Sequence, residues 1–159
     1  MRRARRANRN GVTFLDVTIT VLILGILAAV AGVRFFDALD RARAAAAATR
    51  IAADVELCRR WARQTSASAS MEFTAAEHRY VLPDVPDLNH AGTDYAVALS
   101  DEPYESQLAA VEFDDSTTLR FDGFGVPVGL TAPGKIVVRS GSHERTVLID
   151  PHTGRASIQ

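Results

Sequence analysis

Three residues near the N-terminus have types and spacing that could support chemistry. Gly11 ends a basic segment, Val12 opens an apolar run, and Asp16 places a carboxylate at the fifth position of that run. A carboxylate inside a membrane span is costly unless it finds a partner. Cutting the chain after Gly11 would give Val12 a free α-amino group, which could meet Asp16 of a neighbouring subunit in an assembly of staggered helices. We therefore expect a processing site between Gly11 and Val12 and an assembly contact at Asp16.

The other reactive side chains form no pattern typical of an enzyme. The four histidines are dispersed without metal-ligand spacing, and no nucleophile elbow or phosphate-binding glycine loop is present. Cys58 is the single cysteine, so it cannot form a disulfide within the chain. We expect Cys58 to be a small apolar residue on the packed face of a helix. The sequence predicts a protein that is not an enzyme and that has no cofactor and no metal site.

The apolar run from Val12 to Val33 has the length of a membrane span. Asp16 is its one charged residue, and at about 1.5 Å per residue the run would cross the roughly 30 Å hydrocarbon core of a bilayer. Five arginines precede it (Arg2, Arg3, Arg5, Arg6 and Arg9), and such basic flanks stay in the cytoplasm. We expect a single-pass inner-membrane protein with its C-terminal domain in the periplasm.

The helix is expected to continue beyond the membrane. Residues 34–70 contain no proline or glycine and are rich in alanine, which favours helix. Ile51, Val55, Cys58 and Ala62 recur at helical spacing, and such a face is typical of a helix packed on a core. The sequence predicts a basic leader at 1–11, a transmembrane helix at 12–33 and an amphipathic continuation at 34–70.

From residue 71 the pattern changes to that of short strands. Strands are expected at 71–74, 79–82, 95–99, 110–113, 118–121, 135–139, 145–149 and 156–158. Their regular spacing and the turn residues between them favour an antiparallel meander. The predicted fold class is α+β, in which the long N-terminal helix packs on an antiparallel β-sheet formed by a β-rich domain at 71–159.

The segment from Arg9 to Asp16, Arg-Asn-Gly-Val-Thr-Phe-Leu-Asp, resembles the class III signal of the type IV pilin superfamily. In that family a basic leader ends at a glycine, and an acid follows five residues on. The resemblance implies a pilin-like fold, cleavage between Gly11 and Val12 by prepilin peptidase, N-methylation of Val12 and assembly through Asp16. The chain departs from the family in two places: Val12 stands where phenylalanine is commoner, and Asp16 where glutamate is commoner.

The rest of the chain resembles the GspH/FimT type of minor pseudopilin. The similarity lies in Leu57–Arg63 leading into Met71–Thr74, in Leu119–Pro127, in Lys135–Val138 and in Val147–Arg155. It implies a minor subunit of a type II secretion pseudopilus that takes part in protein export. The implied partners are other pseudopilins or pilins of the same filament, the prepilin peptidase and the membrane.

A first alternative is a FimT-like minor pilin of a type IV pilus or competence system, active in DNA uptake. It would require exposed basic residues to converge on the body, and Arg139, Arg145 and Arg155 are the candidates. Nucleic acid is not the expected partner, because 13 basic residues and all 19 acidic ones follow Asn10. The body therefore carries a formal net charge of about −6, whereas phosphate binding needs clustered Lys and Arg.

A second alternative is a secreted soluble protein with an ordinary signal peptide. Ala29-Val30-Ala31 has the small-x-small pattern of a signal peptidase site, and the leader is suitably basic. Two features speak against it: Asp16 would lie inside the apolar core of the signal, and the helical pattern continues past the cut.

Overall fold

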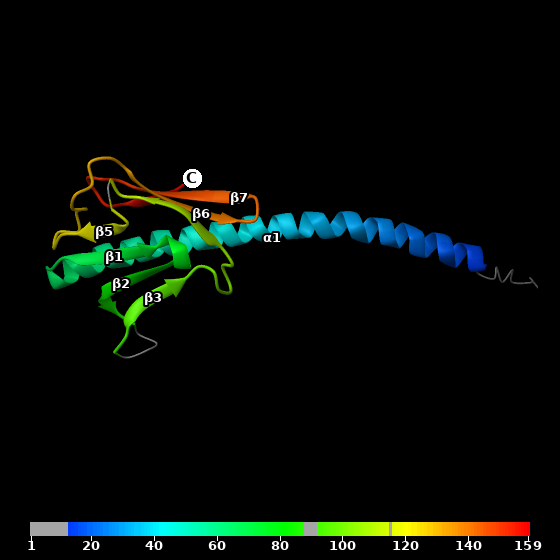
Figure 1. Ribbon diagram of the computed structural model, residues 1–159, viewed down its shortest axis with the longest axis horizontal. Helices are drawn as coiled ribbons and strands as arrows, with labels where there is room; N and C mark the ends of the chain where they lie inside the picture. Colours follow the sequence, from blue (N-terminus) through cyan, green and yellow to red (C-terminus); the bar gives the residue numbers. More distant parts are fainter. Residues whose placement is uncertain (1–12, 88–91, 115) are drawn as a thin grey trace, which may run out of the picture. The chain divides into compact units, whose positions relative to one another are not determined.

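The computed structural model describes residues 13–87, 92–114 and 116–159, and the chain divides into two compact units, Met1–Phe36 and Asp37–Gln159. Helix α1 (Phe14–Thr65) supplies the described part of the first unit and continues into the second (Figure 1). The second unit also contains the short 3-10 helix η1 (Ala75–Glu77) and eight strands. These are β1 (Ala69–Thr74), β2 (Arg79–Pro86), β3 (Asp94–Ala98), β4 (Gln107–Glu112), β5 (Thr118–Phe121), β6 (Gly134–Ser140), β7 (His143–Ile149) and β8 (Ala156–Ile158).

The strands form two antiparallel sheets, where the sequence predicted one. The first sheet has the order β3-β2-β1-β5 and the second has the order β4-β6-β7-β8. The meander is interrupted twice: β4 pairs with β6 instead of with β3, and β5 pairs with β1 (Ala69 opposite Phe121) instead of with its sequence neighbours β4 and β6. The α+β class is confirmed, but the chain changes sheets after β3, after β4 and after β5.

The helix packs against both sheets through small and apolar side chains. Within the second unit, α1 contributes Ala47, Ala48, Ile51, Val55, Cys58 and Ala62 to the core, and all six are fully buried. The first sheet adds Met71, Tyr80 and Leu82, and the second adds Ile136, Val138 and Val147. The predicted helical face of Ile51, Val55, Cys58 and Ala62 is thereby confirmed as a core face.

Helix α1 ends earlier than the sequence predicted. The continuation was expected to run to residue 70, but the last helical residue is Thr65, and Ala69 and Ser70 already belong to β1. Ser66 adopts a positive φ of 52°, and the N–H of Ala67 donates to the carbonyl of Ala62, which closes the last turn. A left-handed residue of this kind is a common way to end a helix.

The predicted strands are confirmed with small changes at their ends. The hairpin around residues 75–78 is β1–β2, with Glu72 opposite Val81, and the strongest predicted pair is β6–β7. Strand β4 begins three residues before its predicted start at 110, because Gln107 and Leu108 also pair with β6.

The second unit is expected to fold without the first. Every member of its core cluster lies at or after Ala47, so a fragment Asp37–Gln159 keeps the whole core. We expect this fragment to be soluble and to unfold cooperatively on heating, measured by circular dichroism. A control fragment beginning at Ser68 lacks the helix that both sheets pack on, and it should not fold. A molten or aggregated Asp37–Gln159 fragment would contradict the division into units.

Candidate functional site

The start of α1 is closed by a reciprocal pair of side chains. The backbone N–H and the hydroxyl of Thr13 both donate to Oδ2 of Asp16, at 3.0 Å and 2.8 Å, and the N–H of Asp16 donates back to the Thr13 hydroxyl at 3.3 Å. This is the geometry of a capping box, which satisfies N–H groups that a helix start otherwise leaves without partners. The pattern Thr-x-x-Asp is readable in the sequence, but the sequence interpretation gave Asp16 only an assembly role.

The capping box leaves one carboxylate oxygen of Asp16 uncommitted. All its hydrogen bonds go to Oδ2, and within the described residues Oδ1 accepts none. Asp16 is exposed on the side of the helix start, where the helix dipole favours a negative charge. A second cation or donor can therefore bind Asp16 without breaking the cap. Gly11 and Val12, the predicted processing site, lie outside the described residues.

The first unit presents an uncovered apolar surface. Among the side chains that the structure describes between Phe14 and Phe36, twelve large hydrophobic ones are exposed, which are Phe14, Leu15, Val17, Ile19, Val21, Leu22, Ile23, Leu24, Ile26, Leu27, Phe35 and Phe36. An 18-residue window of the helix reaches a mean hydropathy of 2.5, and none of it is buried. By length and composition this helix could cross a membrane.

The hydroxyl groups of this segment are satisfied within the helix. Thr18 donates to the carbonyl of Leu15 at 2.9 Å, and Thr20 donates to the carbonyl of Asp16 at 2.6 Å. In hydrocarbon an unpaired polar group is costly, so these local bonds make both threonines compatible with a lipid environment. The beginning of α1 thus combines one carboxylate with a surface that is otherwise apolar.

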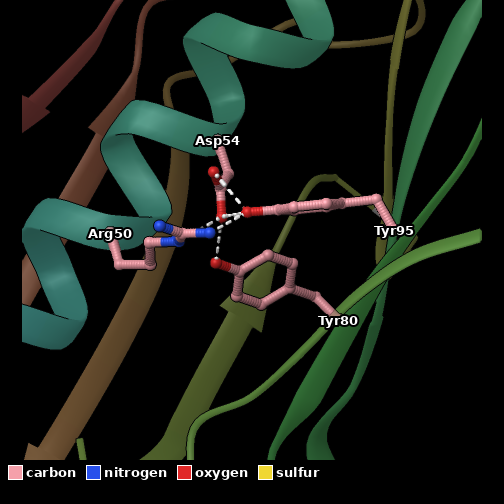
Figure 2. A network of polar contacts seen from close by, with 4 residues as sticks. All are labelled: Arg50, Asp54, Tyr80 and Tyr95. Atoms are coloured by element: carbon pink, nitrogen blue, oxygen red, sulfur yellow. Dashed lines mark hydrogen bonds and ion pairs between the residues drawn. The ribbon is translucent and has the colours of Figure 1, made fainter. Parts of the chain in front are cut away.

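A polar cluster of four residues, with Asp54 and Tyr80 buried and Arg50 and Tyr95 partly exposed, joins α1 to the first sheet of the second unit (Figure 2). Asp54 is 4% exposed, and its Oδ2 accepts hydrogen bonds from the Tyr80 hydroxyl at 2.6 Å and from Arg50 Nε at 3.0 Å. The Tyr95 hydroxyl donates to Oδ1 of Asp54 at 3.0 Å, and Arg50 also contacts this hydroxyl. Each of the four side chains therefore has a polar partner, as the buried carboxylate of Asp54 requires.

Both tyrosines and the arginine of this cluster keep their protons near neutral pH. Burial, reinforced by the Asp54 carboxylate, raises the pKa of Tyr80, and the same causes raise the pKa of Tyr95 to about 12. Burial alone would lower the pKa of Arg50, but Asp54 and the tyrosines outweigh it and raise it. Both phenols stay protonated and the guanidinium stays charged, so the cluster is an anchor between helix and sheet rather than an acid–base centre.

Cys58 is not placed for nucleophilic chemistry. It is fully buried on the core face of α1, and burial raises the pKa of its thiol to about 12. The nucleophilic thiolate is therefore scarce at neutral pH. Within the part of the chain that the structure describes, no group of three His, Cys, Asp or Glu side chains is arranged to hold a metal ion.

The three arginines considered for DNA binding lie apart from one another. Arg139 is opposite Glu144 in the β6–β7 pair and forms an ion pair with it at 2.6 Å. Arg145 is opposite Val138, so its side chain starts from the other face of the sheet. The carbonyl of Arg155 accepts a hydrogen bond from the backbone N–H of Asp150. Asp150 follows Arg145 by five residues, or about 17 Å along the strand direction. The fold does not gather these residues into one basic surface.

The Asp54 cluster predicts unequal effects for two substitutions. Tyr80→Phe removes one donor and leaves Asp54 with its other partners, so we expect a loss of about 1 kcal/mol in the free energy of unfolding. Asp54→Ala leaves Arg50 and the Tyr80 hydroxyl without their shared acceptor, and about 3 kcal/mol should be lost. Denaturant unfolding of the full chain in detergent micelles measures both. Equal effects would show that Asp54 does not organise the cluster.

The raised pKa of Tyr95 predicts a loss of stability at alkaline pH. The folded state holds the phenolic proton up to about pH 12, whereas an unfolded tyrosine releases it near 10.0. Above pH 10 the folded state therefore binds more protons, and stability falls as the pH rises towards 12. Unfolding midpoints between pH 8 and pH 11 should decline less steeply for Tyr95→Phe than for the original chain. Parallel curves would contradict this assignment.

Comparisons of the chain with protein-family models, with curated proteins and with solved structures found no match.

Proposed function

We propose that the chain is a membrane-anchored subunit that assembles with other subunits through its N-terminal helix, as a minor pseudopilin of a type II secretion pseudopilus does. The observation that carries the proposal is the beginning of α1. There Asp16 presents a carboxylate whose Oδ1 accepts no hydrogen bond from the described residues, at the start of a helix whose large side chains are all apolar and exposed as far as Leu27. None of the described residues covers this surface, so lipid or other helices would supply its cover.

The role of Asp16 in this assembly is electrostatic. In the membrane, an α-amino group at Val12 of a neighbouring subunit would neutralise the Asp16 carboxylate and remove the cost of a lone charge there. The capping box holds the carboxylate at a fixed place on the helix start, because two bonds from Thr13 converge on Oδ2. Oδ1 is the atom that would accept the amine. The second unit then carries the part of the subunit that lies outside the membrane.

Processing between Gly11 and Val12 tests the proposal most directly. We expect the mature protein to begin at Val12 and to carry a methyl group on that amine, because the basic leader ends where the apolar helix begins. Mass spectrometry of the protein isolated from membranes measures the terminus. A terminus at Gly32, after the small residues Ala29 and Ala31, would replace the proposal by a secreted soluble protein.

Substitutions at Asp16 separate helix capping from pairing between subunits. Asp16→Asn keeps an oxygen that Thr13 can donate to but removes the charge, whereas Asp16→Glu keeps both. If the carboxylate pairs with a neighbour's amine, Asp16→Asn should insert into the membrane normally and lose most of its incorporation into the filament. Asp16→Glu should incorporate like the original chain. Crosslinking in membranes measures incorporation, and normal assembly of Asp16→Asn would show that Asp16 serves only as a cap.

A further inference from the structure

Strand β3 forms an open edge of the first sheet. It is the outermost strand in the order β3-β2-β1-β5 (Figure 1). The N–H of Leu99 donates to the carbonyl of His78, just ahead of β2, and backbone groups alternate in direction along an antiparallel strand. The N–H and carbonyl groups of Val97 therefore face β2, whereas those of Ala96 and Ala98 face outward. No residue that the structure describes forms a hydrogen bond with these outward groups.

The other sheet edges are bulged, covered or short. Strand β4 has a register shift between Leu108 and Ala110, and the N–H of Leu108 donates to Nδ1 of His78. The free side of β5 is covered by the loop that follows it, where the N–H of Val128 donates to the carbonyl of Arg120. Strand β8 is only three residues long. The two outward alanines of β3 carry neither charge nor proline, so this edge lacks the usual protection against pairing.

A shallow, open hollow on α1 lies where a further strand would be added beside β3. Its lining is Ala45, Ala46, Thr49, Arg50 and Ala53 of α1, together with Tyr104. Strand β3 reaches this side of the helix, because the Tyr95 hydroxyl contacts Asp54 and Arg50 (Figure 2). At about 100° per residue, Arg50 lies about 40° beyond Asp54 round the helix, in the direction away from the core. Ala46 and Ala53 lie about 80° and 100° beyond it. A strand next to β3 would therefore cover these two exposed alanines.

We propose that the edge of β3 binds an extended segment of another protein as an added antiparallel strand. The outward N–H and carbonyl groups require a partner with an extended backbone, since a strand presents donors and acceptors at the matching spacing. Antiparallel addition continues the pairing found throughout both sheets. The partner's side chains on the α1 side should be apolar, because they would cover Ala46 and Ala53. Backbone bonds supply affinity in this mode of binding, and the covered side chains supply selectivity.

The added strand comes from a different protein. The eight strands of the described residues all belong to the two sheets already, so a second copy of the chain offers no unpaired strand to donate. The binding involves the second unit alone and does not rest on the proposed membrane-anchored role. It is compatible with a minor subunit, because such a subunit is surrounded by proteins of other sequences.

A synthetic peptide tests this binding on the full-length protein in detergent micelles. The probe is fluorescein-Lys-Val-Thr-Val-Thr-Val-Lys-amide, whose valines would face α1 while the backbone of its threonines bonds to β3. We expect saturable binding by fluorescence anisotropy. Without the peptide the amides of Ala96 and Ala98 should exchange rapidly with solvent, and the bound peptide should slow their exchange at least about tenfold.

Matched peptides and variants test the backbone bonds. N-methylation of both threonines removes the N–H groups that face β3 in antiparallel pairing, so binding should be lost. N-methylation of the valines is the control, because their N–H groups face away from β3. Ala96→Pro removes an outward N–H without breaking a bond to β2, and it should weaken binding about tenfold, whereas Ala96→Val should not.

A further pair of variants tests the surface on α1. Ala53→Glu places a charge beneath the valines and should weaken binding severalfold. Gln64→Glu adds the same charge at an exposed position of α1 outside the hollow and should leave the affinity unchanged. Equal effects of the two variants would show that the peptide does not lie over the alanines, and would overturn the proposed position of the strand.

Three other results would overturn the proposal. They are the absence of saturable binding, binding that tolerates methylation of both threonines, and an unchanged affinity of Ala96→Pro. Slow exchange of the Ala96 and Ala98 amides in a peptide-free dimer would also overturn it, because a second copy would then occupy the edge. If Ala96→Pro lowers the thermal unfolding midpoint, the methylated peptides decide the matter, since they leave the protein unchanged.

Discussion

The fold of the second unit depends on one helix face that two sheets share. Neither sheet covers its own apolar side, and the core cluster includes residues of both sheets together with Ile51 and Val55 of α1. The helix can serve both sheets because many of its buried residues are small. Ala44, Ala47, Ala48 and Ala62 are fully buried, and their short side chains let strands approach the helix closely. Removing the helix would expose both sheets at once, so helix and sheets must form together.

The Asp54 cluster gives this packing a unique register. Apolar contacts along an alanine-rich helix do not by themselves distinguish one axial position from another, because alanines repeat along it. A buried carboxylate that must meet Tyr80 from β2 and Tyr95 from β3 does distinguish them, since a shift of the helix would leave a buried charge without partners. At the other end of the unit, His143 Nε2 lies 2.8 Å from Oδ1 of Asp37, and this hydrogen bond lowers the pKa of Asp37. The helix is thus tied to the first sheet in the interior and to the β6–β7 hairpin at the surface.

The local structure of this protein could be predicted from its sequence more completely than the pairing of its strands. The helix, its core face and the β6–β7 hairpin follow from periodicity and turn residues, which act over a few positions. The two-sheet arrangement does not, because β4 pairs with β6 instead of with β3, and β5 pairs with β1 about 50 residues earlier. Only packing in three dimensions selects these partners. The same limit applies to the polar cluster. In the sequence, Asp54 is one of several acidic residues on a helix, and no neighbouring residue indicates that it contacts Tyr80 or Tyr95. The capping box, by contrast, follows from a local pattern, Thr-x-x-Asp, because its two members are only three residues apart.

The role of Asp16 as a helix cap is compatible with its proposed role in pairing with a neighbouring subunit, and the cap favours the pairing. A carboxylate at the third helical position satisfies the helix start through one oxygen, and the helix dipole offsets part of its negative charge. A residue placed there is held in position before any neighbour arrives, so little conformational freedom is lost when a cation binds its other oxygen. A glutamate would reach further into the space beside the helix, while the shorter aspartate stays close to Thr13. The short aspartate therefore keeps Oδ1 close to the start of the helix, so a cation that binds this oxygen must approach the helix start itself.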